Sequence, residues 1–175
     1  PMARTAALAL LVAGLVASVA AQSIQVTTDT GVVAGSVYDN TEQFLGIPYA
    51  ADTGGANRFQ PPQPRAAWPG VWDATKWGDG CYQTHHNADV PKNISEDCLN
   101  LNVWRPKGTT ASDKLPVMIF WHGGSFAEGS NQGPFYIYRG SNLAGRAPVI
   151  VVSANYRLGA LGFVVTDKLK GNNGL

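Results

Sequence analysis

His122-Gly123-Gly124-Ser125 is the stretch best suited to chemistry in this chain of 175 residues. It follows a continuous apolar run, residues 117–121, whose composition predicts a strand buried on both faces. Glycine has no Cβ, so the backbone after such a strand can turn sharply and present bare N–H groups. N–H groups held in this way stabilise negative charge that develops on a carbonyl oxygen. A tight turn without a ligand is the other interpretation, and on these residues alone both stand equally.

Other candidate nucleophiles and bases fit a catalytic role less well. Ser125 lies in Gly-Gly-Ser-Phe-Ala, which departs from the G-x-S-x-G elbow, and the Gly- and Pro-broken residues 128–135 are not the helix that an elbow requires. His122 has no acid placed in sequence to orient it as a base. The remaining candidates are interpreted as solvated or structural: His85, His86, Asp29, Asp97 and Glu128.

Residues 1–21 are typical of a secretory signal peptide, and residues 22–175 are interpreted as the folded domain. A single basic residue, Arg4, precedes a run of Ala, Leu and Val that is shorter than a membrane span and ends on small residues. Cleavage is expected after Ala20 or Ala21, giving an exported chain without a transmembrane segment. Removing Arg4 from 13 basic residues leaves 12 against 12 acidic ones, so no nucleic-acid partner is expected.

The two cysteines, Cys81 and Cys98, are expected to form one disulfide. An even pair at modest separation in an exported chain most simply pairs with itself. Metal binding together with the neighbouring His85 and His86 is the alternative, but the paired C-x-x-C spacing of a zinc site is missing. Between the cysteines, Asn93 begins an N-x-S sequon, which makes it a glycosylation candidate on the surface.

The pattern of the chain predicts an α/β fold. Residues 23–37 and 41–49 predict a hairpin and a third strand of a small antiparallel N-terminal sheet. Residues 50–80 are irregular, and their tryptophans are expected to anchor them to a core. Leu99, Leu101 and Val103 alternate with polar residues, which predicts a strand with an apolar buried face. A buried strand at 148–154, after one helical turn near 142–144, is far enough from residues 117–121 to fit an α/β sheet.

Several motifs in consistent order resemble the type-B carboxylesterase family, which includes cholinesterases and fungal secreted lipases. They are GIPYA, RF-x-PP-x-P followed by W-x-G-x-W-x-A, EDCLNLNVW, the HGG loop, NYRLGALGF and the terminal GNNGL. The resemblance implies the N-terminal part of a large α/β-hydrolase fold, ending before the nucleophile elbow. That part comprises the small antiparallel sheet and the first strands of the central mixed sheet.

The resemblance also implies roles for individual residues. Gly124 and Ser125 match the oxyanion-hole donors, with Gly123 as a loop hinge, although Ser125 replaces a glycine of the family pattern. Cys81 and Cys98 match a family disulfide, and Arg58 and Glu96 match a buried structural ion pair. The family's nucleophilic serine, acid and histidine have no counterpart in the printed sequence.

The expected function is hydrolysis of a small carboxylic ester or a lipid, without a cofactor. Because the catalytic triad is missing, the 175 residues are expected to be inert alone. The alternatives are a non-catalytic esterase-like binding or adhesion protein, or a truncated gene product. A parallel sheet that ends at residues 148–154 is also expected to leave apolar edges uncovered and to aggregate readily. The sequence carries no prediction of the oligomeric state.

Overall fold

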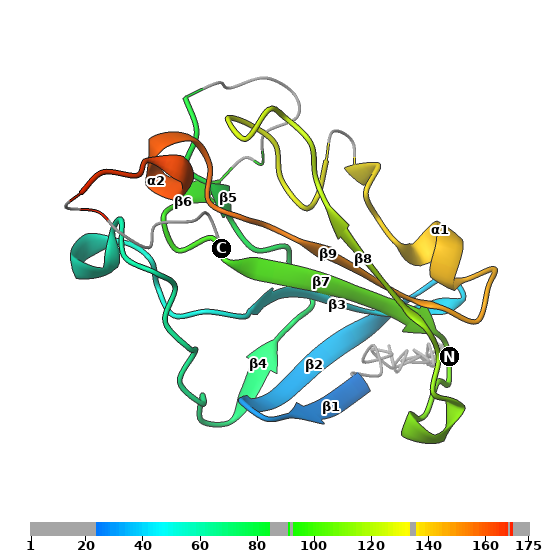
Figure 1. The fold of residues 1–175 in the computed structure, drawn as a ribbon. Helices are drawn as coiled ribbons and strands as arrows, with labels where there is room; N and C mark the ends of the chain where they lie inside the picture. The colour runs from blue at the N-terminus through cyan, green and yellow to red at the C-terminus, as the bar shows by residue number, and fades with distance from the viewer. Residues whose placement is uncertain (1–23, 85–90, 92, 134–135, 168, 170–175) are drawn as a thin grey trace, which may run out of the picture.

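The structure is a computed structural model that describes residues 24–84, 91, 93–133, 136–167 and 169. Its centre is one seven-stranded sheet in the order β1-β2-β3-β7-β9-β8, with β4 paired to β2 (Figure 1). A two-stranded sheet, β5-β6, lies apart from it. The elements are β1 Ile24–Thr28, β2 Gly31–Tyr38, β3 Thr41–Pro48, η1 Gly55–Asn57, β4 Val71–Asp73, β5 Gly80–Cys81, β6 Ile94–Ser95, β7 Asn100–Pro106, η2 Ala111–Asp113, β8 Val117–Trp121, α1 Ser141–Ala144, β9 Ile150–Ala154 and α2 Gly159–Phe163.

The N-terminal strands confirm the predicted hairpin. β1 pairs antiparallel with β2 from Thr28↔Gly31 onward, and the Thr28 hydroxyl donates to the Gly31 carbonyl oxygen over 2.8 Å. At its other end β2 pairs with β3, and β3 pairs with β7. The antiparallel strands are therefore continuous with the central sheet.

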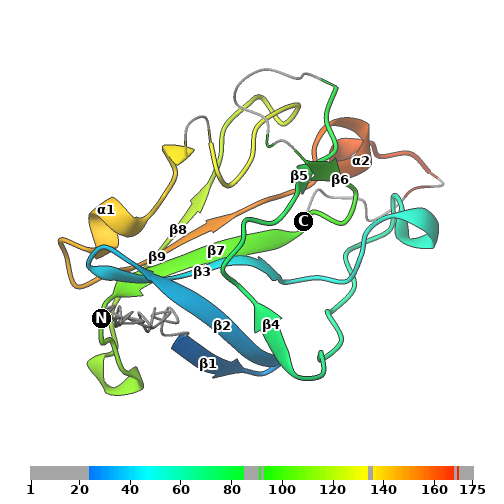
Figure 2. The ribbon, with the colours of Figure 1, turned by 180° about the vertical axis from the view of Figure 1, so that it is seen from behind.

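The irregular segment after β3 packs on the hairpin through its tryptophans, as expected. Its only strand, β4, runs parallel to β2 on the side seen in Figure 2. The Trp68 indole lies so close to Gly31 that a Cβ there would come within 2.5 Å of Nε1, and that N–H donates to the Val32 carbonyl oxygen. Trp72 donates to the carbonyl oxygen of Gly46 over 3.3 Å. Each indole thus partly buries its ring and still satisfies its N–H.

Strand β7 differs from the prediction. The face that carries Leu101 and Val103 is only partly buried, whereas Asn100, Asn102 and Trp104 on the opposite face are buried. Asn102 is 0% exposed. The alternating pattern predicted the strand correctly. The prediction that the face with Leu101 and Val103 is the buried one is wrong.

Hydrogen bonding explains how β7 buries asparagines. The Asn102 Oδ1 accepts from the Gly46 N–H over 2.9 Å, and its Nδ2 lies 3.1 Å from the Ser153 hydroxyl oxygen, to which it donates. Asn100 donates to the carbonyl oxygens of Asp79 and Cys98. Buried amides cost little when partners surround them. A polar network therefore joins β3, β7 and β9.

Strands β8 and β9 form the parallel pair predicted for an α/β fold. Their register runs from Val117↔Ile150 to Trp121↔Ala154, and the connection between them contains α1, which confirms the predicted helical turn. Two core clusters lie on opposite faces of the sheet, because Phe44 and Leu45 are neighbours in β3 and belong to different clusters. Helix α1 packs against β3, β7 and β9.

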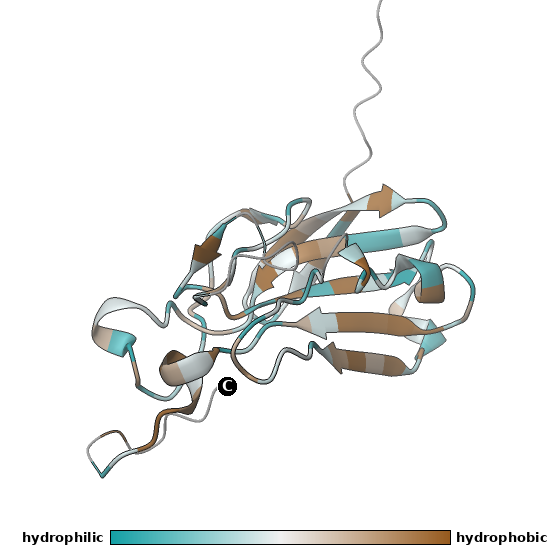
Figure 3. Cartoon of the chain, turned by 90° about the horizontal axis from the view of Figure 1, so that it is seen from above, coloured by the Kyte–Doolittle hydropathy of each residue, from teal (hydrophilic) through white to brown (hydrophobic). Residues whose placement is uncertain are grey.

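Strand β8 is not buried, contrary to the prediction. All five of its side chains are 41–55% exposed, and both apolar strands at this edge colour as hydrophobic in Figure 3. Within the described part of the chain β8 is the last strand of the sheet, and its only strand neighbour is β9. Its apolar run suits a strand that is covered on both faces and paired on both edges. Within the described residues, β8 has a paired strand on one edge only. The uncovered apolar edge that we expected is therefore present.

No helix among the described residues is long and apolar enough to cross a membrane.

Candidate active site

The candidate site lies at the carboxyl ends of β8 and β9. Because the two strands are parallel, these ends meet at one edge of the sheet, the place where α/β folds bind ligands. β8 leads into residues 122–129, hereafter the glycine loop. β9 leads into residues 155–158. A cavity of about 150 Å³ is lined by both ends of the glycine loop, by Ser130 and Gly133, and by Tyr138.

The glycine loop has an unusual backbone. Gly124, Ser125 and Phe126 have consecutive φ values of 114°, 54° and 60°. A Cβ on Gly124 would come within 2.0 Å of the Glu128 carbonyl oxygen, so this position requires glycine. Left-handed backbone at two successive non-glycine residues is strained, and such strain is concentrated at functional sites.

The same turn leaves several successive N–H groups without an acceptor among the described residues. The Gly124 carbonyl oxygen accepts from the N–H groups of Ala127 and Glu128, at 3.0 and 3.1 Å. Within the described residues, the N–H groups of Gly123, Gly124, Ser125 and Phe126 donate to no acceptor, and Gly124 and Ser125 are the middle two of these four. Successive N–H groups in such a turn form an anion-binding concavity. Gly123 differs from Gly124, because its φ is not positive and a Cβ there would meet nothing within 4 Å.

The residues after β9 hold the glycine loop from one side. The Tyr156 hydroxyl donates to the His122 carbonyl oxygen over 2.8 Å, and the two rings stack with centroids 4.5 Å apart. The Gly159 N–H, at the start of α2, donates to the Phe126 carbonyl oxygen over 2.7 Å. Phe126 also contacts the Phe163 ring of α2.

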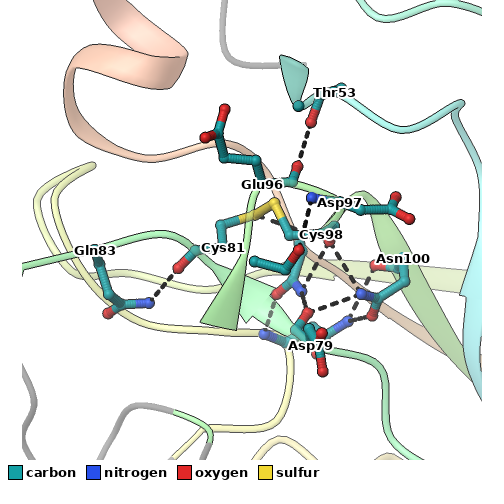
Figure 4. Close-up of a disulfide and its surroundings, with 12 residues drawn as sticks. Thr53, Asp79, Cys81, Gln83, Glu96, Asp97, Cys98 and Asn100 are labelled. Carbon is teal, nitrogen blue, oxygen red and sulfur yellow. Dashed lines mark hydrogen bonds between the residues drawn. A yellow bond between two sulfur atoms is a disulfide. The ribbon is translucent and has the colours of Figure 1, made fainter. Parts of the chain in front are cut away.

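Gln83 holds the far end of the glycine loop, and sequence reasoning missed it. Its Oε1 accepts from the Gly129 N–H over 2.8 Å, and its Nε2 donates to the Gly129 carbonyl oxygen over 2.9 Å. Nε2 also donates to the Cys81 carbonyl oxygen (Figure 4). The only signal in the sequence is a glutamine two residues after a cysteine, which is too common to single out.

His122 is buried and has no carboxylate partner in the described structure. Its Nδ1 lies 2.7 Å from the Gly123 carbonyl oxygen, which can only accept, so Nδ1 carries the proton. Burial lowers the pKa of the imidazole, and the bond to Gly123 opposes this shift. That His122 is not a triad base stays a prediction. Ser125 is exposed and lies in a turn, without the helix that a nucleophile elbow requires.

The disulfide between Cys81 and Cys98 is confirmed. The sulfur atoms are 2.05 Å apart, and each cysteine is 1% exposed. The bond joins the end of β5 to the segment between β6 and β7 (Figure 4). His85 and His86, the alternative metal ligands, lie outside the described residues. In the part that is described, no three His, Cys, Asp or Glu side chains group as metal ligands.

Arg58 and Glu96 form the implied ion pair, but it is not buried. Arg58 Nε donates to Glu96 Oε2 over 2.7 Å, and Nη2 contacts Oε1. The Arg58 side chain is 49% exposed and that of Glu96 24%. Thr53 fixes the backbone by donating to the Glu96 carbonyl oxygen (Figure 4). Because water screens an exposed pair, its contribution to stability is smaller than that of the buried pair we expected.

The remaining predicted positions lie on the surface or near it. Asn93 is exposed just before β6, as a glycosylation site requires. Asp29 and Asp97 are exposed, and Glu128 is partly buried.

Comparison with known proteins gives a consistent result. The model of the carboxylesterase family matches residues 22–175. The para-nitrobenzyl esterase of Bacillus subtilis (strain 168) is 42% identical over 144 residues, which are 79% of this chain and 28% of that protein. Mouse cholinesterase is 41% identical over 171 residues, covering 86% of this chain and 27% of the relative. Mouse neuroligin-2 is 40% identical over 172 residues, covering 76% of this chain and 20% of the relative.

The solved structures agree. A structure of PNB esterase superposes with a TM-score of 0.73 at 40% identity, covering 86% of this chain and 30% of that one. The chain thus spans less than a third of these relatives. The fold expectation is confirmed: the sheet matches part of the α/β-hydrolase fold of that esterase. The chain belongs to the carboxylesterase family.

Proposed function

We propose that this chain supplies the oxyanion-binding part of a carboxylic ester hydrolase. The observation that carries the proposal is the strained turn at the carboxyl edge of the parallel strands, in which the N–H groups of Gly124 and Ser125 are among those that have no acceptor within the described residues. Ester hydrolysis passes through a tetrahedral intermediate whose oxygen carries negative charge, and two fixed N–H donors stabilise it. The similarity to para-nitrobenzyl esterase and cholinesterase supports this chemistry, and a small carboxylic ester or lipid is the proposed substrate.

The position of Ser125 is compatible with this role. Its φ of 54° lies in the left-handed region, which a glycine, as in the family pattern, would adopt without steric cost. A serine there keeps the N–H, at the cost of local strain. Gly123, where a Cβ would meet nothing within 4 Å, remains the proposed hinge.

A test on the chain itself uses butyrate as a probe, because a carboxylate resembles the charge of the intermediate. In ¹⁵N-labelled protein, butyrate is expected to shift the Gly124 and Ser125 amide signals saturably. Equal shifts across unrelated surface amides would contradict the proposal. Without a G-x-S-x-G serine, no turnover of nitrophenyl butyrate is expected, and measured turnover would overturn the claim that the triad is missing.

A non-catalytic binding protein is the second candidate. The similarity to neuroligin-2, at 40% identity, is close to that of the esterases and favours it. In that case the glycine loop is a structural remnant, and butyrate leaves the Gly124 and Ser125 signals unmoved.

The location and modification of the chain are also proposals. Residues 1–21, proposed as a cleaved signal peptide, lie outside the described residues. Export is supported by the disulfide, which forms in oxidising compartments. Exposed Asn93 is the proposed glycan acceptor, and a mass shift removed by an N-glycosidase would test it.

A further inference from the structure

The side-chain amide of Gln83 hydrogen-bonds to two backbone segments through both of its N–H groups and its oxygen. Both N–H groups of Nε2 donate, one to Cys81 and one to Gly129, and Oε1 accepts from the Gly129 N–H. The two bonds to Gly129 resemble a pair between adjacent strands, and they fix which end of the amide is oxygen. Gln83 is only 4% exposed, so water does not compete for these bonds.

Gly129 links Gln83 to the rest of the glycine loop through its contact with His122. Its φ is 110°, and a Cβ there would come within 2.5 Å of His122 Nδ1. The Gly129 backbone therefore packs directly on the His122 ring, which bonds to the Gly123 carbonyl oxygen. A shift of Gly129 must displace His122, and with it the residues that precede Gly124.

The disulfide holds Gln83 in turn. Cys81 is two residues away and is covalently joined to Cys98. The neighbouring Tyr82 N–H donates to the Ser95 carbonyl oxygen over 3.0 Å, so the segment is tied on both sides. Both views of the ribbon place the β5-β6 pair at the end of the sheet from which the glycine loop extends (Figure 1, Figure 2).

We propose that Gln83 is a positioning residue, through which the Cys81–Cys98 disulfide fixes the glycine loop so that the Gly124 and Ser125 N–H groups point to one anion. This inference rests on the proposed oxyanion role of those two N–H groups. This role does not require Gln83 to touch a reacting atom. It acts through Gly129 and His122, and an oxyanion hole is sensitive to small displacements of its donors.

Replacement by methionine tests the proposal on the 175-residue chain, because Gln83→Met keeps the length and removes all three hydrogen bonds. The control is Gln132→Met. Gln132 is also buried, donates to the Gly78 carbonyl oxygen over 2.8 Å, and has no hydrogen bond to the glycine loop. Both variants lose buried amide bonds, so a general loss of stability affects both.

Two measurements are made on each variant: hydrogen exchange of the Gly129 amide, and the dissociation constant of butyrate from shifts of the Gly124 and Ser125 amides. In Gln83→Met, Gly129 is expected to exchange about tenfold faster, and butyrate to bind about fivefold more weakly or worse. In Gln132→Met both values should stay near wild type. Equal effects in the two variants would overturn the proposal.

Failure of the proposed function gives a different result. If wild-type protein does not bind butyrate but Gly129 exchange still rises only in Gln83→Met, the loop is held by Gln83 and the oxyanion role is wrong. If butyrate binds wild type and Gln83→Met alike, the oxyanion role stands and the positioning role is wrong. Should Gln83→Met not fold, Gln83→Glu serves instead, because its carboxylate still accepts from Gly129 but cannot donate. Unchanged butyrate binding in Gln83→Glu would likewise overturn the proposal.

Discussion

Strand β8 and the glycine loop are adjacent in sequence, but the side chains of β8 are exposed, whereas the loop is fixed by several hydrogen bonds. Every β8 side chain is at least 41% exposed, and within the described residues the strand pairs only with β9. The loop that follows is tied by Tyr156, Gln83 and Gly159 and contains a buried histidine. The contrast shows that the loop does not depend on cover over the strand. It depends on contacts that come from β9 and from the disulfide segment.

The largest expected effect comes from Gly124→Ala. The new Cβ overlaps the Glu128 carbonyl oxygen and the residue must keep a φ of 114°, so we expect a loss of about 3 kcal/mol in the free energy of unfolding. Gly123→Ala is the matched control, and it should change stability by less than about 1 kcal/mol. Chemical denaturation measures both. Equal costs at the two glycines would show that the loop is not fixed as described.

Two residues that lie opposite each other in β8 and β9 test whether β8 is exposed as described. Val151 of β9 lies opposite Met118 of β8, yet Val151 is 8% exposed and Met118 52%. Val151→Ala should cost about 2 kcal/mol, because it removes buried methyl groups. Met118→Ala should cost less than about 1 kcal/mol and leave the loop amide signals unchanged. A larger loss at Met118 would mean that β8 is covered in solution, for instance by self-association.

The smallest effect is a pH dependence from His122. Burial lowers its folded pKa below the ordinary 6.5, so the unfolded chain binds the proton more readily. Stability from this group is complete above pH 6.5 and falls as the pH drops below that value, by less than about 1.4 kcal/mol per pH unit. His122→Asn removes the titration and can still donate to the Gly123 carbonyl oxygen. A stability curve between pH 7 and 5 that is identical in the two proteins would contradict the shift.

The sequence by itself determined the family, the β1-β2 hairpin, the parallel pair, the disulfide and the position of the glycine loop. Each follows from local properties: glycine spacing, apolar runs, turn residues, and two cysteines with no other partner. The ordered motifs also predict Gly124 and Ser125 as the donors, because donors of this kind are backbone groups that local glycine content reveals, and this role stays a proposal.

Only the tertiary structure decided which faces are buried and which residues hold the loop. Alternation cannot tell which face of β7 is buried, because Asn100 and Asn102 become buried residues only when partners from distant segments satisfy their amides. Composition cannot show that β8 is the last strand of the described part of the sheet, since edge and centre differ in neighbours and not in residues. Gln83 acts on Gly129 across 46 positions, and the exposure of Arg58 depends on packing around it. These are long-range contacts, and no local pattern in the chain encodes them.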